Sequence, residues 1–375
     1  MAFEQGPIRP PSEAASLLIR VARNCPWNKC KFCLTYKDTA FSRRDPEEVR
    51  REILGIRELT DRVRALSLRQ GCGGEVNEQV VRAAYSELGP YGARVAVWLY
   101  HGARTVFLQD ANALDVKTAD LVAILEQIRN SFPPVERVTI YARANTAARK
   151  SLEDLKSIRQ AGLSRIHLGM ESGSADVLTF MAKGITPEIL IKAGQKIVAA
   201  GISLCVYVMP GLGGRRWSHE HALETARVIN AINPDHIRLR SLAVVPGTPL
   251  HDDVQAGSFH TLAEDDLVRE IRLLIESLEG ISSRVVSDHI LNLLEEVEGQ
   301  LPGDKAAMLA VIDRYLNLPD AERVNFQVGR RMGVYRSLED MLNPARYSQV
   351  SGAVEYLCGQ GDVEGGLAKI KERFL

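Results

Sequence analysis

The sequence lacks the features that mark membrane proteins, secreted proteins and nucleic-acid binders. No apolar run is long enough to cross a bilayer, and the first residues, Met-Ala-Phe-Glu-Gln-Gly-Pro, have neither the basic nor the apolar part of a signal peptide. Basic and acidic residues balance at 47 each, so net charge gives no argument for a nucleic-acid partner. We therefore expect a cytoplasmic protein that binds neither membranes nor nucleic acid.

Cysteine is also scarce, and its distribution excludes a disulfide framework. The 375 residues include six cysteines, of which Cys25, Cys30 and Cys33 are clustered. Three close thiolates are one ligand short of a structural zinc site, and no second CxxC or HxxxH pair supplies the rest. A four-iron cluster held by three thiolates leaves one iron open for a small molecule. We favour the cluster; the alternative is a zinc knuckle completed by a distant Cys or His.

Most of the chain alternates between strands and helices. Apolar stretches flanked by turn residues predict six strands, over 16–23, 105–109, 137–142, 165–169, 202–209 and 236–242. Helices are predicted between the later strands, over 118–131, 152–161, 186–200 and 218–232. This alternation is typical of a parallel sheet covered by helices, and six units are too few to close an eight-stranded barrel. We predict an α/β fold, a curved and partly open barrel.

Two regions depart from this alternation. A charged helix is predicted from Asp45-Pro46 to about Leu68, followed by a Gly-rich break at 71–74 and about two more helical segments to His101. After Pro249 the strand pattern disappears, and helices are predicted over 264–278, 287–300, 304–316 and 338–341. We predict a barrel domain over 1–250 with a helical insertion at about 45–103, and a C-terminal helical domain over 251–375.

The cysteines follow the first predicted strand, and ligand sites in parallel α/β sheets gather at the carboxyl ends of the strands. The segment Cys25–Cys33, with Phe32 just before its last cysteine, resembles the cluster loop of the radical S-adenosylmethionine (radical SAM) superfamily. The strand–helix units over roughly 14–250 are similar to the partial barrel of that superfamily. Its usual spacing is CxxxCxxC, whereas this chain has CxxxxCxxC.

The resemblance implies a [4Fe-4S] cluster ligated by Cys25, Cys30 and Cys33, with SAM bound at the fourth iron and Phe32 against the adenine. Reductive cleavage of SAM would give methionine and a 5′-deoxyadenosyl radical, which abstracts hydrogen from a small-molecule substrate. The resemblance also implies an oxidoreductase that works under oxygen-poor conditions with an electron donor such as flavodoxin or ferredoxin.

The exit of the second strand is expected to bind the methionine amino group. The superfamily often has Gly-Gly-Glu there, whereas this chain has Gln109-Asp110-Ala111-Asn112. Gln109, Asp110 or Asn112 can accept the same hydrogen bonds, and Asp110 adds a negative charge for an ammonium group. The literal Gly73-Gly74-Glu75 follows a charged helical stretch, so we do not assign it this role.

The next two strand exits supply Arg143 and Glu171. Arg143 is expected to meet a carboxylate of the cofactor or substrate, the alternative being a surface salt bridge. The resemblance implies that Glu171 binds the ribose hydroxyls of SAM, and the alternative is a carboxylate at a helix N-terminus. The run from Gly169 to Thr186 resembles the branch that contains oxygen-independent coproporphyrinogen oxidases and methylthiotransferases.

The fifth strand exit is rich in glycine and proline. Such a loop, which follows Tyr207 and contains Gly211, lets the backbone approach a ligand closely. The resemblance implies that Tyr207 and this loop lie near the adenine of SAM. His219 and His221 follow this loop. We expect them on the surface of a helix and assign them no ligand role.

The substrate is expected to meet the sixth strand and the helical tail. Arg238 and Arg240 are two residues apart on a strand, so they share a face and either bind an anionic substrate or pair with nearby acids. His289 and Asn292 share a face of a predicted helix, which either closes the site or lies on the surface.

We predict a radical SAM enzyme. The alternatives are a coproporphyrinogen-oxidase-like protein of the haem pathway, although Thr35 stands where that family has a fourth cysteine, and a non-catalytic iron–sulfur or metal-binding scaffold.

Overall fold

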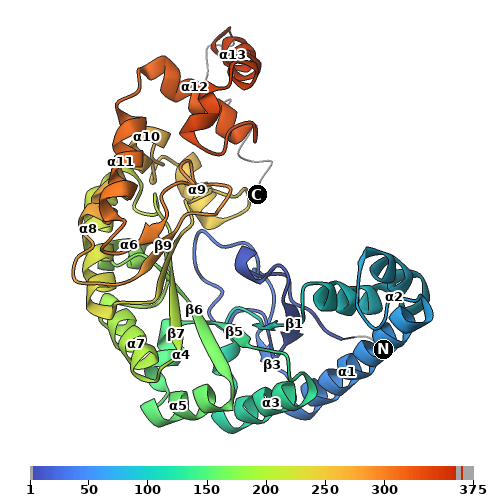
Figure 1. Cartoon of the computed structure of the whole chain (residues 1–375). Helices are drawn as coiled ribbons and strands as arrows, with labels where there is room; N and C mark the ends of the chain where they lie inside the picture. The colour runs from blue at the N-terminus through green and yellow to red at the C-terminus, as the bar shows by residue number, and fades with distance from the viewer. Residues whose placement is uncertain (1–2, 360–364, 366–375) are drawn as a thin grey trace. The chain divides into compact units, whose positions relative to one another are not determined.

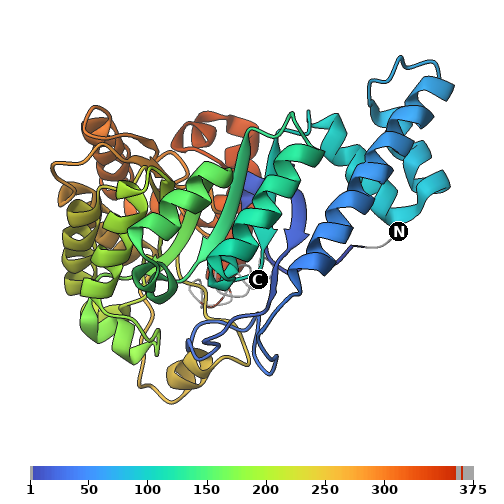
Figure 2. The same cartoon turned by 90° about the horizontal axis from the view of Figure 1, so that it is seen from below.

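The computed structural model describes residues 3–359 and 365 (Figures 1 and 2). These residues divide into two compact units. Unit 1 comprises Met1–Asn28, Thr35–Gly169 and Lys192–Leu204, and unit 2 comprises Lys29–Leu34, Met170–Ile191 and Cys205–Leu375, as far as these residues are described. The cysteine segment therefore belongs to both units. Its first cysteine lies in unit 1, and its other two lie in unit 2.

Unit 1 is built on parallel strands. In order of pairing, they are β1 (Leu17–Arg20), β4 (Thr105–Gln109), β5 (Arg137–Ala142) and β6 (Leu163–Glu171), whose last two residues lie in unit 2. Val106, Phe107 and Leu108 are fully buried, as expected for a parallel strand covered on both faces. A short antiparallel pair, β2 (Ala22–Arg23) and β3 (Ser42–Arg43), flanks the cysteine segment in the sequence.

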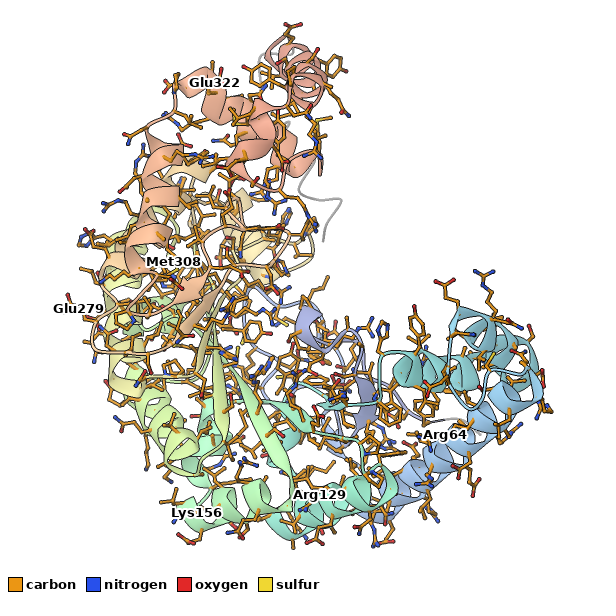
Figure 3. The ribbon with its side chains drawn as sticks, viewed as in Figure 1. Arg64, Arg129, Lys156, Glu279, Met308 and Glu322 are labelled. Atoms are coloured by element: carbon orange, nitrogen blue, oxygen red, sulfur yellow. The ribbon has the colours of Figure 1, made fainter. Side chains whose placement is uncertain are left out.

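The helices of unit 1 follow the predicted signals closely. They are α1 (Pro46–Arg69), α2 (Glu78–Tyr100), α3 (Thr118–Ser131), α4 (Ala144–Arg149) and α5 (Leu152–Ala161), and α7 (Pro187–Ala199) runs across the boundary between the units. The Asp45 carboxylate caps α1, and α2 is broken at Gly89 into the two predicted segments. Helices α3 and α5 pack on one another, and Figure 3 shows Arg129 and Lys156 on their outer side.

Unit 2 continues with three parallel strands and an antiparallel one. These are β7 (Ser203–Val208, its first two residues in unit 1), β8 (His236–Leu239), β9 (Arg284–Val286) and the antiparallel β10 (Gly299–Gln300). Its helices are α6 (Ala175–Phe180), α8 (Gly214–Ile232), α9 (Pro249–Gln255), α10 (Glu264–Glu276), α11 (Lys305–Leu316), α12 (Asp320–Arg331) and α13 (Pro344–Gly359). Short 3-10 turns form at η1 (Pro11–Glu13) and η2 (Ala113–Asp115) in unit 1, and at η3 (Leu338–Leu342) in unit 2.

Two buried arginines of α12 hold the segment that follows β9. The Arg331 guanidinium donates to the Glu264 carboxylate of α10 at 2.8 Å, and both side chains are buried. Arg330 donates to the carbonyl oxygens of Asn292 and Leu293 at 3.3 and 3.1 Å. These contacts fix the irregular segment between β9 and β10 against the C-terminal helices.

The predicted fold class is confirmed, because the described sheet is mostly parallel, helices follow its strands and further helices lie toward the C-terminus. The predicted helix over 287–300 is wrong, and β9 and β10 contradict the expectation that strands end before Pro249. The segment 287–298 is irregular, but its buried Leu291, Leu294 and Val297 recur every third residue, which imitates a helical pattern.

The predicted domains over 1–250 and 251–375 stay predictions, and residues 1–2, 360–364 and 366–375 of those ranges lie outside the described residues. None of the helices in the described residues combines the length and apolar character that crossing a bilayer requires.

Candidate functional site

All three cysteines of the Cys25–Cys33 segment are half-buried. Within unit 2, the backbone N–H of Cys33 donates to the carbonyl oxygen of Cys30 at 3.3 Å, which closes a tight turn. Between them, Lys31 donates its backbone N–H to the Met181 carbonyl at 3.0 Å and its ammonium group to the Asp253 carboxylate at 2.9 Å. The turn with two of the three thiols is thus anchored within unit 2.

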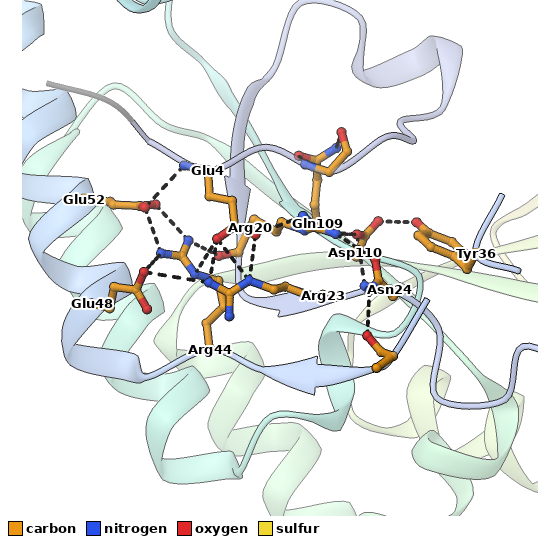
Figure 4. A network of polar contacts seen from close by, with 12 residues as sticks. Glu4, Arg20, Arg23, Asn24, Tyr36, Arg44, Glu48, Glu52, Gln109 and Asp110 are labelled. Carbon is orange, nitrogen blue, oxygen red and sulfur yellow. Dashed lines mark hydrogen bonds and ion pairs between the residues drawn. The ribbon is translucent and has the colours of Figure 1, made fainter. Parts of the chain in front are cut away.

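The flanks of the cysteine segment in unit 1 are anchored by Asp110, which is fully buried after β4 (Figure 4). Its Oδ2 atom accepts hydrogen bonds from the Arg20 guanidinium at 2.6 and 3.1 Å and from the backbone N–H of Asn24 at 3.2 Å. Its Oδ1 atom accepts from the hydroxyl group of Tyr36. Asn24 directly precedes the first cysteine, and Tyr36 follows the last by three residues, so one carboxylate holds both flanks.

Asp110 is thus hydrogen-bonded to three groups of the protein, and its binding of the methionine amino group stays a prediction. Burial raises the pKa of the Tyr36 phenol, and its hydrogen bond to Asp110 raises the pKa further, so the hydroxyl group remains a donor. The carboxylate that the sequence assigned to the methionine amino group is engaged by a guanidinium, a backbone N–H and a phenol.

Gln109 and Asn112 are fully buried on either side of Asp110, and their amides bind within unit 1. The Gln109 Oε1 atom accepts from the backbone N–H of Gly6 at 2.8 Å, and its Nε2 atom donates to two carbonyls of the same N-terminal segment. The Asn112 Oδ1 atom accepts from the backbone N–H of Arg143 at 2.9 Å, and its Nδ2 atom donates to the Thr146 hydroxyl at 2.9 Å. Both amides therefore position neighbouring backbone.

Arg143 lies against the cysteine segment. It is the N-cap residue of α4, and its guanidinium carbon lies 5.0 Å from the ring centroid of Trp27, within the range of a cation–π contact. The predicted Arg143 is therefore brought together with the segment that carries Cys25 in unit 1.

Glu171 ends β6 in an unusual backbone conformation. Its φ angle is 65°, which few residues other than glycine adopt and which tends to occur at functional sites. Its carboxylate accepts from the Lys183 ammonium group at 3.0 Å, and the two side chains are 14 and 11% exposed. The Lys183 ammonium group also lies 5.6 Å from the ring centroid of Phe32. Because α6 is capped by Ser174, the alternative reading of Glu171 as a helix-terminal carboxylate is wrong.

The β7 exit loop is held by a buried carboxylate from α10. The backbone N–H of Gly211 (φ 85°) donates to Glu270 at 2.6 Å, and a Cβ atom at position 211 would come within 3.1 Å of Leu267. The Ser218 hydroxyl donates to the other oxygen of Glu270 at 2.6 Å. Burial raises the pKa of Glu270, and His221 is the largest influence that lowers it.

His221 corrects an expectation, because it is buried rather than on the helix surface, whereas His219 is exposed as expected. The His221 Nδ1 atom lies 2.8 Å from the Ser172 hydroxyl oxygen, and its Nε2 atom lies 3.2 Å from the Met209 carbonyl oxygen. The imidazole therefore joins the β6 exit, one residue after Glu171, to the β7 exit. No local pattern distinguished it from a surface histidine, since both partners are distant in sequence.

The two predicted arginines at the β8 exit differ in burial and in ion pairing. Arg238 is buried beside its register partner Tyr207 and is paired with Asp288, its Nε atom 2.9 Å from Oδ1. Arg240 lies just beyond the strand, is exposed and has no carboxylate partner among the described residues. That the two arginines share a face stays a prediction, because β8 ends at Leu239, one residue before Arg240.

The segment after β9 brings His289 and Asn292 to the same exit. Burial lowers the pKa of His289 to about 4, and the neighbouring Arg240 lowers it as well. The Asn292 side chain accepts from the backbone N–H and hydroxyl of Ser241, both at 2.9 Å, and donates to the Leu239 carbonyl at 2.9 Å. Asn292 therefore joins this segment to β8, while His289 lies beside the exposed arginine.

Each unit thus gathers part of the predicted set. Unit 1 holds Cys25, Gln109, Asp110, Asn112 and Arg143 around the exits of β4 and β5. Unit 2 holds Cys30, Phe32, Cys33, Glu171, Tyr207, Gly211, Arg238, Arg240, His289 and Asn292 around the exits of β6, β7 and β8. The Gly73-Gly74-Glu75 sequence lies in the turn between helices α1 and α2, so it does not follow a strand.

The donor set of the cysteine segment fits an iron–sulfur cluster. Thiolates are the ligands that such clusters use, and three of them leave one iron for another ligand. Within residues 3–359, no three side chains of His, Cys, Asp or Glu stand close enough together to form a metal site. The assignment therefore rests on the chemistry of the thiols and on their place after β2.

Residues 91–226, about a third of the chain, match the sequence model of the radical SAM superfamily. The matched range begins after the cysteine segment, and it contains the exits of β4, β5, β6 and β7. Proteins of this superfamily bind a [4Fe-4S] cluster and SAM. This match agrees with the predicted resemblance over residues 91–226.

Curated relatives match part of the chain. An uncharacterised protein of Methanocaldococcus jannaschii is 27% identical over 157 residues, which cover 42% of this chain and 47% of the relative. The heme chaperone HemW of Bacillus subtilis is 21% identical over 179 residues, which cover 47% of this chain and 46% of HemW. The chain thus spans about half the length of the curated relatives it matches.

Among solved structures, coproporphyrinogen III oxidase (HemN) from Escherichia coli is 16% identical, and the match covers 70% of this chain and 52% of HemN with a TM-score of 0.44. A similarity at this level supports no inference about this chain.

Proposed function

We propose that the chain is a radical SAM enzyme acting on an anionic small molecule, because residues 91–226 match the sequence model of that superfamily. The observation that carries the proposal is the matched domain, preceded in the chain by three clustered thiols. Cys25, Cys30 and Cys33 would hold the cluster. Once reduced, a bound [4Fe-4S] cluster supplies the electron that cleaves SAM into methionine and a 5′-deoxyadenosyl radical.

The residues of unit 2 have the properties that SAM binding needs. Lys183 occupies one carboxylate oxygen of Glu171, and the carboxylate retains acceptor sites for the two ribose hydroxyls. Gly211, held by Glu270, offers backbone without a side chain beside Tyr207 for the adenine. Phe32 packs at the edge of a buried apolar cluster that includes Met181 and Met209, which suits a ring-stacking contact.

The charges at the β8 exit favour an anionic substrate. Arg238 is neutralised by Asp288, so Arg240 is the guanidinium left to meet a carboxylate or phosphate. His289 is uncharged at neutral pH, because its pKa is about 4. Its Nδ1 atom accepts from the backbone N–H of Leu291 at 3.2 Å, which leaves Nε2 protonated and able to donate to the same anion.

The proposal is tested by following 5′-deoxyadenosine. Reduced, reconstituted protein should form it slowly from SAM alone, and fractions of cell extract retained on an anion-exchange resin should accelerate its formation. The acceleration should be weaker for Arg240→Gln. If no well-reduced preparation cleaves SAM, the chain is not a radical enzyme, and if only unretained fractions accelerate cleavage, the substrate is not an anion.

A haem-binding role is a second candidate, favoured by the match to a heme chaperone over nearly half of the chain. The same assay separates the two functions. A carrier of this kind would bind hemin, and hemin would not accelerate the formation of 5′-deoxyadenosine.

Replacing Glu171 by alanine or glutamine should weaken SAM binding about ten- to a hundredfold, because charge-assisted hydrogen bonds of this type contribute about 1.5–3 kcal/mol. Iron content should not change, since Glu171 lies on another element than the cysteines. Calorimetry with SAM measures the first effect and iron analysis the second. Glu75→Ala is the matched control, because Glu75 is exposed in the turn between α1 and α2. Unchanged affinity in both Glu171 variants would remove Glu171 from the SAM site.

A further inference from the structure

Unit 1 contains a cavity that the proposed radical chemistry does not use. It lies between the N-terminal segment, β1 and α2, and its volume is about 550 Å³, which falls in the range of small-molecule sites, about 300–1,000 Å³. Of its lining residues, Gln109 alone belongs to the predicted SAM site. The proposed SAM site therefore does not explain this cavity.

About half of the surface that lines the cavity is apolar, and the rest is polar. Leu17 and Leu18 come from β1, and Ala93, Val97 and Trp98 come from α2. Trp98 is buried, and its indole N–H donates to the Thr105 carbonyl at 2.9 Å, so its ring is fixed and presents apolar surface. Gln109, at the end of β4, has both polar atoms of its side chain bonded to the N-terminal segment. These walls offer surface for burying an apolar group.

The charged groups of the cavity are all of one sign. Arg9 and Arg94 line it, and no Asp or Glu does. Arg9 donates to the carbonyl oxygen of Ala14 at 3.1 Å, and Arg94 binds the side-chain oxygen of Gln5. Neither guanidinium has a carboxylate partner among the described residues. A guanidinium has five donors, so both retain donors for an anion.

We propose that this cavity binds an amphipathic organic anion, an acyl or aryl chain that ends in a carboxylate. The apolar part packs on Leu17, Leu18, Val97 and Trp98, and the carboxylate is bound by the guanidinium groups at the cavity. The two guanidinium groups, with no carboxylate in the lining, favour an anion over a cation, and the apolar half of the lining favours an anion that carries an apolar chain. The inference needs neither a cluster nor SAM, so it stands or falls separately from the proposed function.

The probe is laurate, compared with dodecylammonium, which has a chain of the same length and the opposite charge. Calorimetric titration of the 375-residue protein, without iron or SAM and below micelle-forming concentrations, should show saturable binding of laurate only. Substituting both guanidiniums (Arg9→Gln with Arg94→Gln) should weaken laurate binding about tenfold or more, because charge-assisted hydrogen bonds are lost. Ala93→Trp, which fills the cavity from α2, should abolish binding.

The matched control is Arg82→Gln, on the exposed side of the same helix α2, paired with Glu78 and absent from the cavity lining. It should leave laurate affinity unchanged. The proposal is overturned if dodecylammonium binds as tightly as laurate, if laurate does not bind up to its solubility limit, or if Arg82→Gln weakens binding as much as the cavity variants do. A melting curve for each variant confirms that a loss of binding is not a loss of folding.

Discussion

Replacing any one of Cys25, Cys30 and Cys33 by alanine is expected to abolish cluster binding. Anaerobic reconstitution of the unaltered protein should give about four iron and four sulfide ions per chain, with the visible absorption of a [4Fe-4S] cluster. The three thiolates are the only protein ligands proposed, so a variant with two of them cannot hold the cluster at three corners. Iron and sulfide analysis after reconstitution measures the effect.

Cys72→Ala is the matched control, because Cys72 is a half-buried free thiol in the turn between α1 and α2, away from any strand exit. It should retain the full complement of iron. Two results contradict the assignment. One is a variant of the cysteine segment that keeps a complete cluster. The other is a protein that is purified with one tightly held zinc ion that iron does not displace, which identifies the segment as a zinc knuckle.

The fold was predictable wherever local signals bound an element on both sides. Helix α5 begins and ends at the predicted residues because Ser151 forms a capping box with Asp154 and Gly162 ends the helix with a φ angle of 129°. Strands β4 and β5 also match their predicted bounds. By contrast, β9 has three residues and β10 two, which is too short for any period to show, so their pairing depends on tertiary contacts.

The candidate site was predictable as a set of strand exits, but the role of each side chain was not. The residue type of Asp110 suits a cofactor ammonium group, yet its partners Arg20 and Asn24 lie 90 and 86 positions away in the sequence. The partner of His221 could not be predicted from the local sequence either, since Ser172 is 49 positions away. A charged or polar residue in the sequence indicates that its side chain can bind a partner, but the folded structure is needed to identify that partner.

Asp110 gives the second large effect. Replacing it by alanine should cost about 3–5 kcal/mol of unfolding free energy. The change leaves the Asn24 N–H and the Tyr36 hydroxyl without their acceptor, and it leaves the Arg20 guanidinium, 13% exposed, with Glu4 as its remaining carboxylate partner. Tyr36→Phe removes one hydrogen bond to the same carboxylate and should cost about 1.5–3 kcal/mol. Asp61→Asn, in the exposed pair with Arg57, is the control and should change stability by less than about 1 kcal/mol. Denaturant unfolding of the iron-free protein measures all three.

The position of Asp110 predicts more than a loss of stability. Because its carboxylate holds the backbone before the first cysteine and the phenol after the last, loosening it should free the cysteine segment while the rest of unit 1 stays folded. In Tyr36→Phe, compared under conditions where it is fully folded, the thiol of Cys25 should react faster with an alkylating reagent, and reconstituted iron should be lost faster to a chelator.

The reactivity of Cys72 should stay constant, since no part of the network in Figure 4 reaches it. Equal rates at Cys25 and equal iron retention in Tyr36→Phe and the unaltered protein would show that Asp110 supports the fold of unit 1 without positioning the thiols.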